Sequence, residues 1–258
     1  MRIARFATGE ADPRYGIVDG EEIVALKGHP LLHGYEPTGD VVALEDARLL
    51  APVIPSKVVC VGMNYAEHRD DMQFTSDRVD RPLFFLKPST AVVGPGDPIR
   101  IPPVEGRVVH ESELAIVVGR VAKQIRREDW KDYVFGYTIA NDVSARDEMF
   151  ADGQWARAKG FDTFCPIGPW IETELDPMAG LEIQSFVDGE PRRHGNTANM
   201  IFNVADILVE AADIWTLLPG DVIITGTPSG LGGFTAGQNI DIDIEGIGRL
   251  SNPALDRD

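Results

Sequence analysis

The alternation of apolar and polar positions along the chain indicates a mostly β protein. Short runs rich in Val, Ile and Phe recur throughout the sequence, and Gly, Pro, Asn or Asp residues bound them. Near the N-terminus these runs cover residues 2–6, 15–18 and 22–26, and the turn residues between them are typical of a β-meander. We therefore expect the chain to begin with a small β unit.

A second series of apolar runs begins after two prolines, Pro52 and Pro55. It consists of VVCVG, PLFFLK, ELAIVVGRV, FGYTIAND, LEIQSFVDG, DVIITGTP and IDIDIEGIG. Each run has the length and the flanking turn residues of a strand. Because proline interrupts regular structure, we place a domain boundary here, with an N-terminal β domain over residues 1–54 and a larger domain over residues 55–258.

Helical patterns are few. We expect helices over residues 64–72, 127–132 and 203–217. In the last of these, Val204, Ile207 and Leu208 have the spacing of one helix face. The predicted fold class is therefore β-dominated α+β, with short helices.

The composition excludes some kinds of partner. Hydrophobic residues make up 43% of the 258 residues, which is enough for a sizeable core. The formal net charge is −17, and a chain this acidic is a poor ligand for nucleic acid, which binds clustered Lys and Arg. The same charge repels an anionic substrate, so a site for one needs local positive groups or a metal ion.

No targeting or membrane segment is apparent. The N-terminal MRIARFATGEADPRYG lacks the apolar core of a signal peptide, and no stretch approaches the roughly 18 apolar residues of a membrane span. We expect a cytoplasmic protein that contacts no membrane. Cys60 and Cys165 stand among apolar residues, which favours two buried structural thiols over a disulfide framework.

Acidic residues flank two of the apolar runs. In HESELAIVV, Glu111 and Glu113 are two residues apart on an expected strand, so their side chains share one face. The following apolar stretch predicts a strand that is buried on both faces. Asp142 follows the run GYTIAN and supplies a third acid. Three carboxylates suit a hard cation such as Mg²⁺ or Mn²⁺, although solvated acids on an exposed edge strand fit the local pattern equally well.

Eight ordered blocks of sequence decide between these two interpretations. They are VGMNYAEH, PLFFLKPSTAVVGPGD, HESELAIVVG, NDVSARD, RAKGFDTFCPIGP, MIFNVADIL, LLPGDVIITGTPSG and IEGIGRLSNP. Together they resemble the fumarylacetoacetate hydrolase family over about residues 55–253, and in particular its bacterial isomerases, acylpyruvate hydrolases and oxaloacetate decarboxylases. The resemblance implies a mixed β-roll, a homodimer or higher homo-oligomer, and a Mg²⁺ or Mn²⁺ ion held by Glu111, Glu113 and Asp142.

The resemblance also implies a catalytic dyad. His68 of NYAEHRDDM matches the family's catalytic histidine, and Asp71 would lie on the same helix face three residues later. A neutral imidazole can take a proton from water while a carboxylate orients the ring. Asp70 is the alternative partner if this segment is irregular.

Three further residues match positions that bind substrate in the family. Arg146 of SARD and Lys159 of RAKGFD would hold a carboxylate and stabilise enolate charge, and Thr227 of TGTPSG would contact substrate. Arg146 and Lys159 could instead be structural partners of the acids. Met149 departs from the family pattern, because many relatives have a substrate-binding Gln there and a thioether is only a weak hydrogen-bond acceptor.

These residues together predict an enzyme that acts on a small 2-oxo acid. We hypothesise that the substrate chelates the cation through its carboxylate and 2-oxo oxygens, and that the enolate so stabilised leads to C–C hydrolysis, isomerisation or decarboxylation. The alternatives are a catalytically silent protein that binds metal and 2-oxo acid on the same fold, and a structural component of an oligomer. The two predict, respectively, ligand binding without turnover and a protein without metal.

Overall fold

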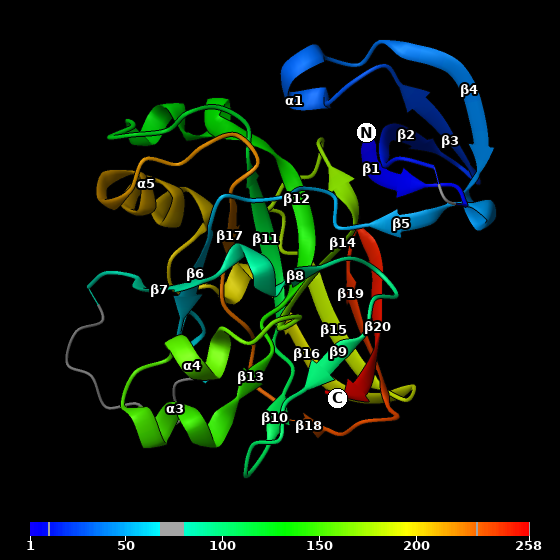
Figure 1. Ribbon diagram of the computed structural model, residues 1–258. Coiled ribbons are helices and arrows are strands. Elements are labelled where there is room, and N and C mark those ends of the chain that lie inside the picture. The colour runs from blue at the N-terminus through cyan, green and yellow to red at the C-terminus, as the bar shows by residue number, and fades with distance from the viewer. Residues whose placement is uncertain (10, 68–79, 231, 258) are drawn as a thin grey trace.

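The computed structural model describes residues 1–9, 11–67, 80–230 and 232–257 (Figure 1). The N-terminal part is a β-meander, which confirms the strands expected over residues 2–6, 15–18 and 22–26. Its elements are β1 (Arg2–Ala7), β2 (Arg14–Asp19), β3 (Glu22–Leu26), α1 (Pro30–His33), β4 (Pro37–Ala43), the 3₁₀ helix η1 (Leu44–Asp46) and β5 (Arg48–Leu50). A small apolar cluster that includes Phe6 and Ile23 packs within it.

The N-terminal strands continue a sheet of the larger part. β1 pairs antiparallel with β14 (Cys165–Glu172), with Arg2 opposite Glu172. From this junction the sheet runs in the order β14-β12-β11-β17-β6-β7. The new strands are β6 (Val58–Gly62), β7 (Leu83–Lys87), β11 (Ser112–Val118), β12 (Val134–Asn141) and β17 (Val222–Ile224). β11 lies between β12 and β17 and is buried along its whole length, as the apolar run predicted.

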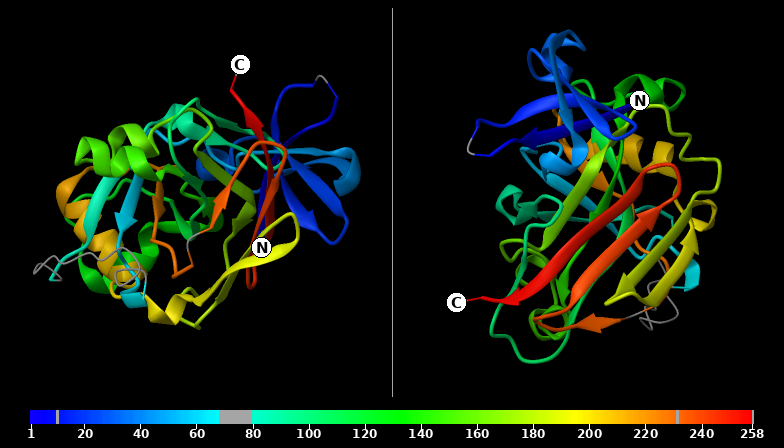
Figure 2. Two further views of the ribbon diagram at one scale, coloured as in Figure 1. Left: turned by 90° about the horizontal axis from the view of Figure 1, so that it is seen from below. Right: turned by 90° about the vertical axis from the view of Figure 1, so that its right-hand side faces the viewer.

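A second sheet packs across the first (Figures 1 and 2). Its strand order is β16-β15-β19-β20-β9, and its strands are β9 (Ile99–Ile101), β15 (Glu182–Val187), β16 (Glu190–Asn196), β19 (Asn239–Ile244) and β20 (Gly248–Asp256). Ile116 and Ile139 of the first sheet share one buried apolar cluster with Ile183 and Ile242 of the second. The main core therefore lies between two sheets, and the expected β-dominated fold, a mixed β-roll with short helices, is confirmed.

Shorter strands complete the roll. β8 (Val92–Val93) pairs with β14, and β10 (Val108–Val109) lies between β13 (Ser144–Ala145) and β18 (Gly233–Phe234). Cys60 and Cys165 are free, fully buried thiols, and burial raises the pKa of Cys165 to about 12. Both therefore have the structural character that their apolar neighbours predicted.

The helices agree only in part with expectation. The helix expected over 203–217 is α5 (Val204–Ile214); Asn203 and Asp206 form its capping box, and it ends where Trp215 becomes extended. Residues 127–132 lie in a 3₁₀ helix, η3 (Arg127–Tyr133), and most of 64–72 lies outside the described residues. The other helices of the described residues were not anticipated: α1, η1, η2 (Ser89–Ala91), α3 (Arg146–Asp152), α4 (Ala156–Lys159) and η4 (Thr197–Asn199). No helix of the described residues is long and apolar enough to cross a membrane.

Candidate metal centre and active site

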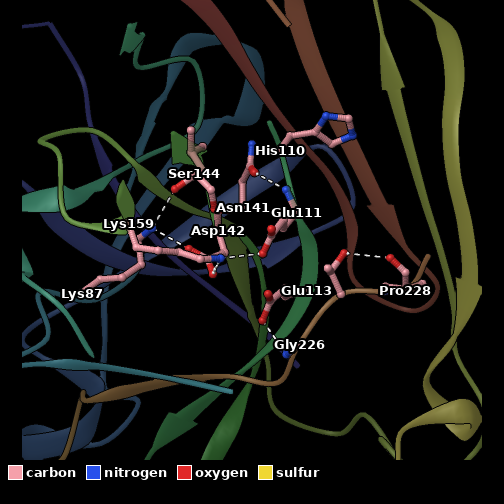
Figure 3. A network of polar contacts seen from close by, with 12 residues as sticks. Lys87, His110, Glu111, Glu113, Asn141, Asp142, Ser144, Lys159, Gly226 and Pro228 are labelled. Atoms are coloured by element: carbon pink, nitrogen blue, oxygen red, sulfur yellow. Dashed lines mark hydrogen bonds and ion pairs between the residues drawn. The ribbon is translucent and has the colours of Figure 1, made fainter. Parts of the chain in front are cut away.

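The antiparallel pairing of β11 with β12 brings the three predicted metal ligands together (Figure 3). Ser112 at the start of β11 lies opposite Asn141 at the end of β12. The Asp142 backbone N–H donates to the Glu111 carbonyl at 2.9 Å, and the Glu111 N–H donates to Asn141 Oδ1 at 3.1 Å. These bonds fix the segment before β11 against the segment after β12, so residues distant in sequence become neighbours.

The carboxylates of Glu111, Glu113 and Asp142 form a compact buried cluster. One oxygen from each lies within 4.8 Å of the other two, and the three residues are at most 8% exposed. Burial, reinforced by the charges of Asp142 and Glu111, raises the pKa of Glu113 well above its usual value. A bound divalent cation would relieve both effects. A buried set of oxygen donors at this spacing fits Mg²⁺ or Mn²⁺.

Gly226 provides a fixed donor to this cluster. Its backbone N–H lies 2.5 Å from Glu113 Oε2. The residue has a φ of 93°, a conformation that side chains other than that of glycine rarely adopt. The loop after β17 therefore needs glycine at this point to aim its N–H at Glu113.

Two buried lysines offset the negative charge. Lys159 Nζ lies 2.7 Å from Glu111 Oε2 and 2.6 Å from Asp142 Oδ2. Lys87 Nζ lies 2.5 Å from Asp142 Oδ1 and donates to the Val143 carbonyl at 3.0 Å. Burial lowers the pKa of Lys159, but Asp142 and Glu111 outweigh that effect and leave the pKa raised. The Lys159 ammonium group is therefore charged at neutral pH.

A cavity opens beside the carboxylate cluster. The residues lining it are Val61, Gly62, Met63, Phe85, Glu111, Glu113, Asp142, Met149, Trp155, Lys159 and Thr227. Phe85 and Trp155 meet edge to face, with ring centroids 5.2 Å apart, and Lys159 Nζ lies 5.0 Å from the centroid of Phe85. The cavity thus has charged groups on one side and an apolar wall on the other.

The other predicted site residues fall into three groups. Lys159 and Thr227 line the cavity, and Thr227 is only 2% exposed. Arg146 begins α3 with its guanidinium carbon 5.9 Å from the centroid of the Phe150 ring, and it does not line the cavity formed by the described residues. His68 and Asp71, with the alternative partner Asp70, lie outside the described residues.

Sequence reasoning missed Lys87, Phe85 and Trp155. Lys87 stands at the end of the apolar run PLFFLK. A charged residue there usually marks the return of the chain to solvent, so the pattern predicted an exposed lysine. Here β7 ends in the interior instead, and Lys87 is 1% exposed.

Comparison with known proteins agrees with this geometry. Residues 57–254 match the family model described as fumarylacetoacetate (FAA) hydrolase C-terminal, and residues 1–52 match the model described as Rv2993c-like, N-terminal. The chain belongs to the fumarylacetoacetate hydrolase family. Its relatives in this family include hydrolases, isomerases and tautomerases, and the chain is an enzyme.

Three relatives are informative. The oxaloacetate tautomerase fahd2 of Xenopus laevis is 40% identical over 227 residues, which are 83% of this chain and 70% of that protein. The 2-hydroxyhepta-2,4-diene-1,7-dioate isomerase of Mycobacterium marinum superposes with a TM-score of 0.90 at 44% identity, covering 100% of this chain and 99% of its own. Maleylpyruvate hydrolase of Sphingobium sp. SYK-6, solved with manganese(II) and pyruvate, superposes at 0.81 with 33% identity and full coverage of both chains.

Proposed function

We propose that this protein is a Mg²⁺- or Mn²⁺-dependent enzyme that acts on a 2-oxo acid by acylpyruvate-type C–C hydrolysis, by isomerisation of a 2-oxo-diacid or by decarboxylation. The observation that carries the proposal is the buried cluster of Glu111, Glu113 and Asp142, which opens onto a cavity that Lys159 also lines. The family relatives include a protein bound to manganese(II) and pyruvate and a tautomerase of oxaloacetate, which supports this substrate class.

The cation would be held by Glu111, Glu113 and Asp142. When bound, it supplies a positive charge that stabilises negative charge on the carboxylate and 2-oxo oxygens of the substrate. Lys159 adds a second positive charge beside the substrate oxygens. Thr227 offers a hydroxyl group from the loop after β17. His68 with Asp71 would move the proton, and Arg146 would hold a carboxylate of the substrate.

These roles explain how an acidic protein binds an anion. The net charge of −17 repels a carboxylate at long range, but the ammonium groups of Lys87 and Lys159 and the cation reverse the local field. We further propose that the protein works in the cytoplasm as a homodimer or higher homo-oligomer. Light scattering of the purified protein tests the oligomeric state.

The decisive experiment is the variant Glu113→Gln, compared with Glu128→Gln as a control. Glu128 is 66% exposed in η3, so its variant makes the same chemical change far from the cluster. Turnover of acylpyruvates, oxaloacetate and unsaturated 2-oxo-diacids is measured while Mg²⁺ or Mn²⁺ is titrated. We expect only Glu113→Gln to lose cation-dependent turnover. Full turnover in that variant would show that the metal site is misassigned.

The same experiment separates the alternative functions. A silent binding protein would take up Mn²⁺ and oxalate without turning over any substrate in the panel. A structural component would contain no metal by elemental analysis and bind no oxalate.

A further inference from the structure

Arg193 is a buried cation on an otherwise exposed strand. It lies in the middle of β16, at the edge of the second sheet, and it is 3% exposed while its neighbours Arg192 and His194 face solvent. Burying a guanidinium costs free energy unless several acceptors meet it. The placement of this side chain therefore calls for an explanation in terms of what it contacts.

The guanidinium connects two segments that build the cavity. Nη1 donates to Thr227 Oγ1 at 2.9 Å and to the Pro228 carbonyl at 2.7 Å. Nη2 donates to the carbonyl of His110, the residue before Glu111, at 2.8 Å. Arg193 thus joins the loop after β17 to the start of the metal-binding segment, although it comes from a different sheet.

The backbone of β16 approaches this loop closely. A Cβ atom built on Gly195 would come within 2.4 Å of Pro228 Cβ, so any larger residue would push the strand away from the loop. Ser185 lies opposite Arg193 on the neighbouring strand β15, and its Oγ lies 2.8 Å from Nε2 of His110. The side of the site that carries Thr227 is therefore fastened to the second sheet by contacts on both strands.

The chemistry of these contacts determines which way the Thr227 hydroxyl points. A guanidinium only donates hydrogen bonds, so Thr227 Oγ1 must accept from Arg193. A hydroxyl has one hydrogen, and that hydrogen is then directed away from Arg193. The acceptor that the described residues offer it is the Pro228 carbonyl at 3.4 Å, which is a long contact. Thr227 lines the cavity, so its hydrogen is available to an oxygen of a bound anion.

We propose that Arg193 is a positioning residue for substrate binding. It orients Thr227 as a hydrogen-bond donor to the carboxylate of the 2-oxo acid. The proposal rests on the proposed function for the class of ligand, but not for the contacts of Arg193. It assigns binding of the ground-state anion, rather than the chemical step, to the pair formed by Arg193 and Thr227.

The test is a double-mutant cycle with Arg193→Met and Thr227→Val, and Arg192→Met is the matched control. Arg192 is the preceding residue on the same strand and is exposed; its side chain lies beside Gly232, but the hydrogen bonds to Thr227, Pro228 and His110 come from Arg193, so the control variant removes the same charge and leaves those bonds in place. We expect Arg193→Met and Thr227→Val each to raise KM for the oxo acid about tenfold, with kcat within about threefold of wild type. The double variant should be no worse than Thr227→Val alone. Arg192→Met should keep the wild-type KM.

Binding of oxalate in saturating Mn²⁺, measured by calorimetry, provides the second readout. It should weaken by the same factor in Arg193→Met and Thr227→Val, while Mn²⁺ binding itself stays at the wild-type level. Additive effects on KM would overturn the proposal. An unchanged KM in Thr227→Val would also overturn it, and this outcome can be measured even if Arg193→Met fails to fold. Failure of the proposed function looks different, because the wild-type protein itself would then bind no Mn²⁺ and turn over no 2-oxo acid.

Discussion

Lys159 Nζ lies 2.6 Å from Oδ2 of Asp142, so an ammonium group contacts one of the carboxylates of the proposed metal site. The same nitrogen contacts Glu111 Oε2. An ammonium and a divalent cation compete for these oxygens, because the carboxylates attract both. Lys87 contacts the other oxygen of Asp142, Oδ1.

This competition predicts opposite effects of Lys159→Met on binding and on turnover. Affinity for Mn²⁺, measured by calorimetry, should rise about tenfold or more, because the competing positive charge is gone. The rate constant kcat for a 2-oxo acid should fall about 10²-fold, because a charge that stabilises the enolate is lost. Arg157→Met is the control: it removes a positive charge from the exposed face of the same helix and should change neither quantity. Weaker Mn²⁺ binding in Lys159→Met would contradict the competition.

A second prediction concerns Asp221, which ties together the two parallel strands β17 and β6. Its Oδ1 accepts from the Ser56 hydroxyl at 2.6 Å, and its Oδ2 accepts from Lys57 Nζ at 2.5 Å and from the Leu218 N–H at 2.8 Å. Asp221→Asn should lower the free energy of unfolding at pH 7 by about 1–3 kcal/mol, the usual cost of losing charge-assisted bonds in the interior. Urea denaturation measures the difference.

The effect of this substitution should depend on pH. Burial raises the pKa of Asp221, but the bonds from Lys57 and Ser56 outweigh burial and leave the pKa below the ordinary 3.8. The unfolded chain therefore takes up the proton first as the pH falls. The stabilising contribution of Asp221 is complete above the ordinary pKa and is lost as the pH falls through the lowered one. The difference in free energy of unfolding between wild type and Asp221→Asn should shrink at pH 3. The variant Asp213→Asn, at an exposed position, should leave the free energy of unfolding unchanged at both pH 7 and pH 3. A constant difference would refute the assignment.

The sequence made part of this site predictable. Glu111, Glu113 and Asp142 stand beside apolar runs, and antiparallel strands that follow one another in the chain commonly pair. The three carboxylates therefore come together because each stands at the end of an apolar run and because β11 pairs with β12, the next long strand in the chain. The family motifs then removed the alternative of solvated acids. The same reasoning placed Lys159 and Thr227, both of which line the cavity.

What could not be predicted depends on contacts between distant segments. Arg192 and Arg193 are adjacent and identical in type, and only the packing of β16 against the loop after β17 buries one of them. The pairing of β1 with β14 joins residues about 170 positions apart in the chain, which no local pattern encodes. Helices α3 and α4 are too short to show a helical period. Met149 is an example, because the family pattern singled out this residue but no pattern predicted the helix α3 that carries it.

Met149 should influence which 2-oxo acid the enzyme prefers. Its side chain is 6% exposed and lies in the apolar wall of the cavity with Phe85 and Trp155. Met149→Gln places an amide there, which needs a polar partner and finds a charged acceptor in the second carboxylate of oxaloacetate but only a neutral carbonyl in the acetyl group of acetylpyruvate. The ratio of kcat/KM for oxaloacetate to that for acetylpyruvate should therefore rise about tenfold. Ala151→Gln, on the exposed face of the same helix, is the control. An unchanged ratio would remove Met149 from the substrate contacts.

The dyad of His68 and Asp71 is a prediction from the sequence that kinetics can test directly. His68→Ala should abolish acylpyruvate cleavage, since the general base is lost, while oxalate binding with Mn²⁺ stays intact because the carboxylate cluster is unchanged. Asp71→Asn should reduce kcat about 10²-fold, because a neutral amide orients the imidazole without stabilising its positive charge. Asp70→Asn is both the control and the rival, with the same substitution one residue away. If the loss of kcat follows Asp70 instead, the segment is not a regular helix there and Asp70 is the partner. Unchanged cleavage by His68→Ala would remove the dyad from the mechanism.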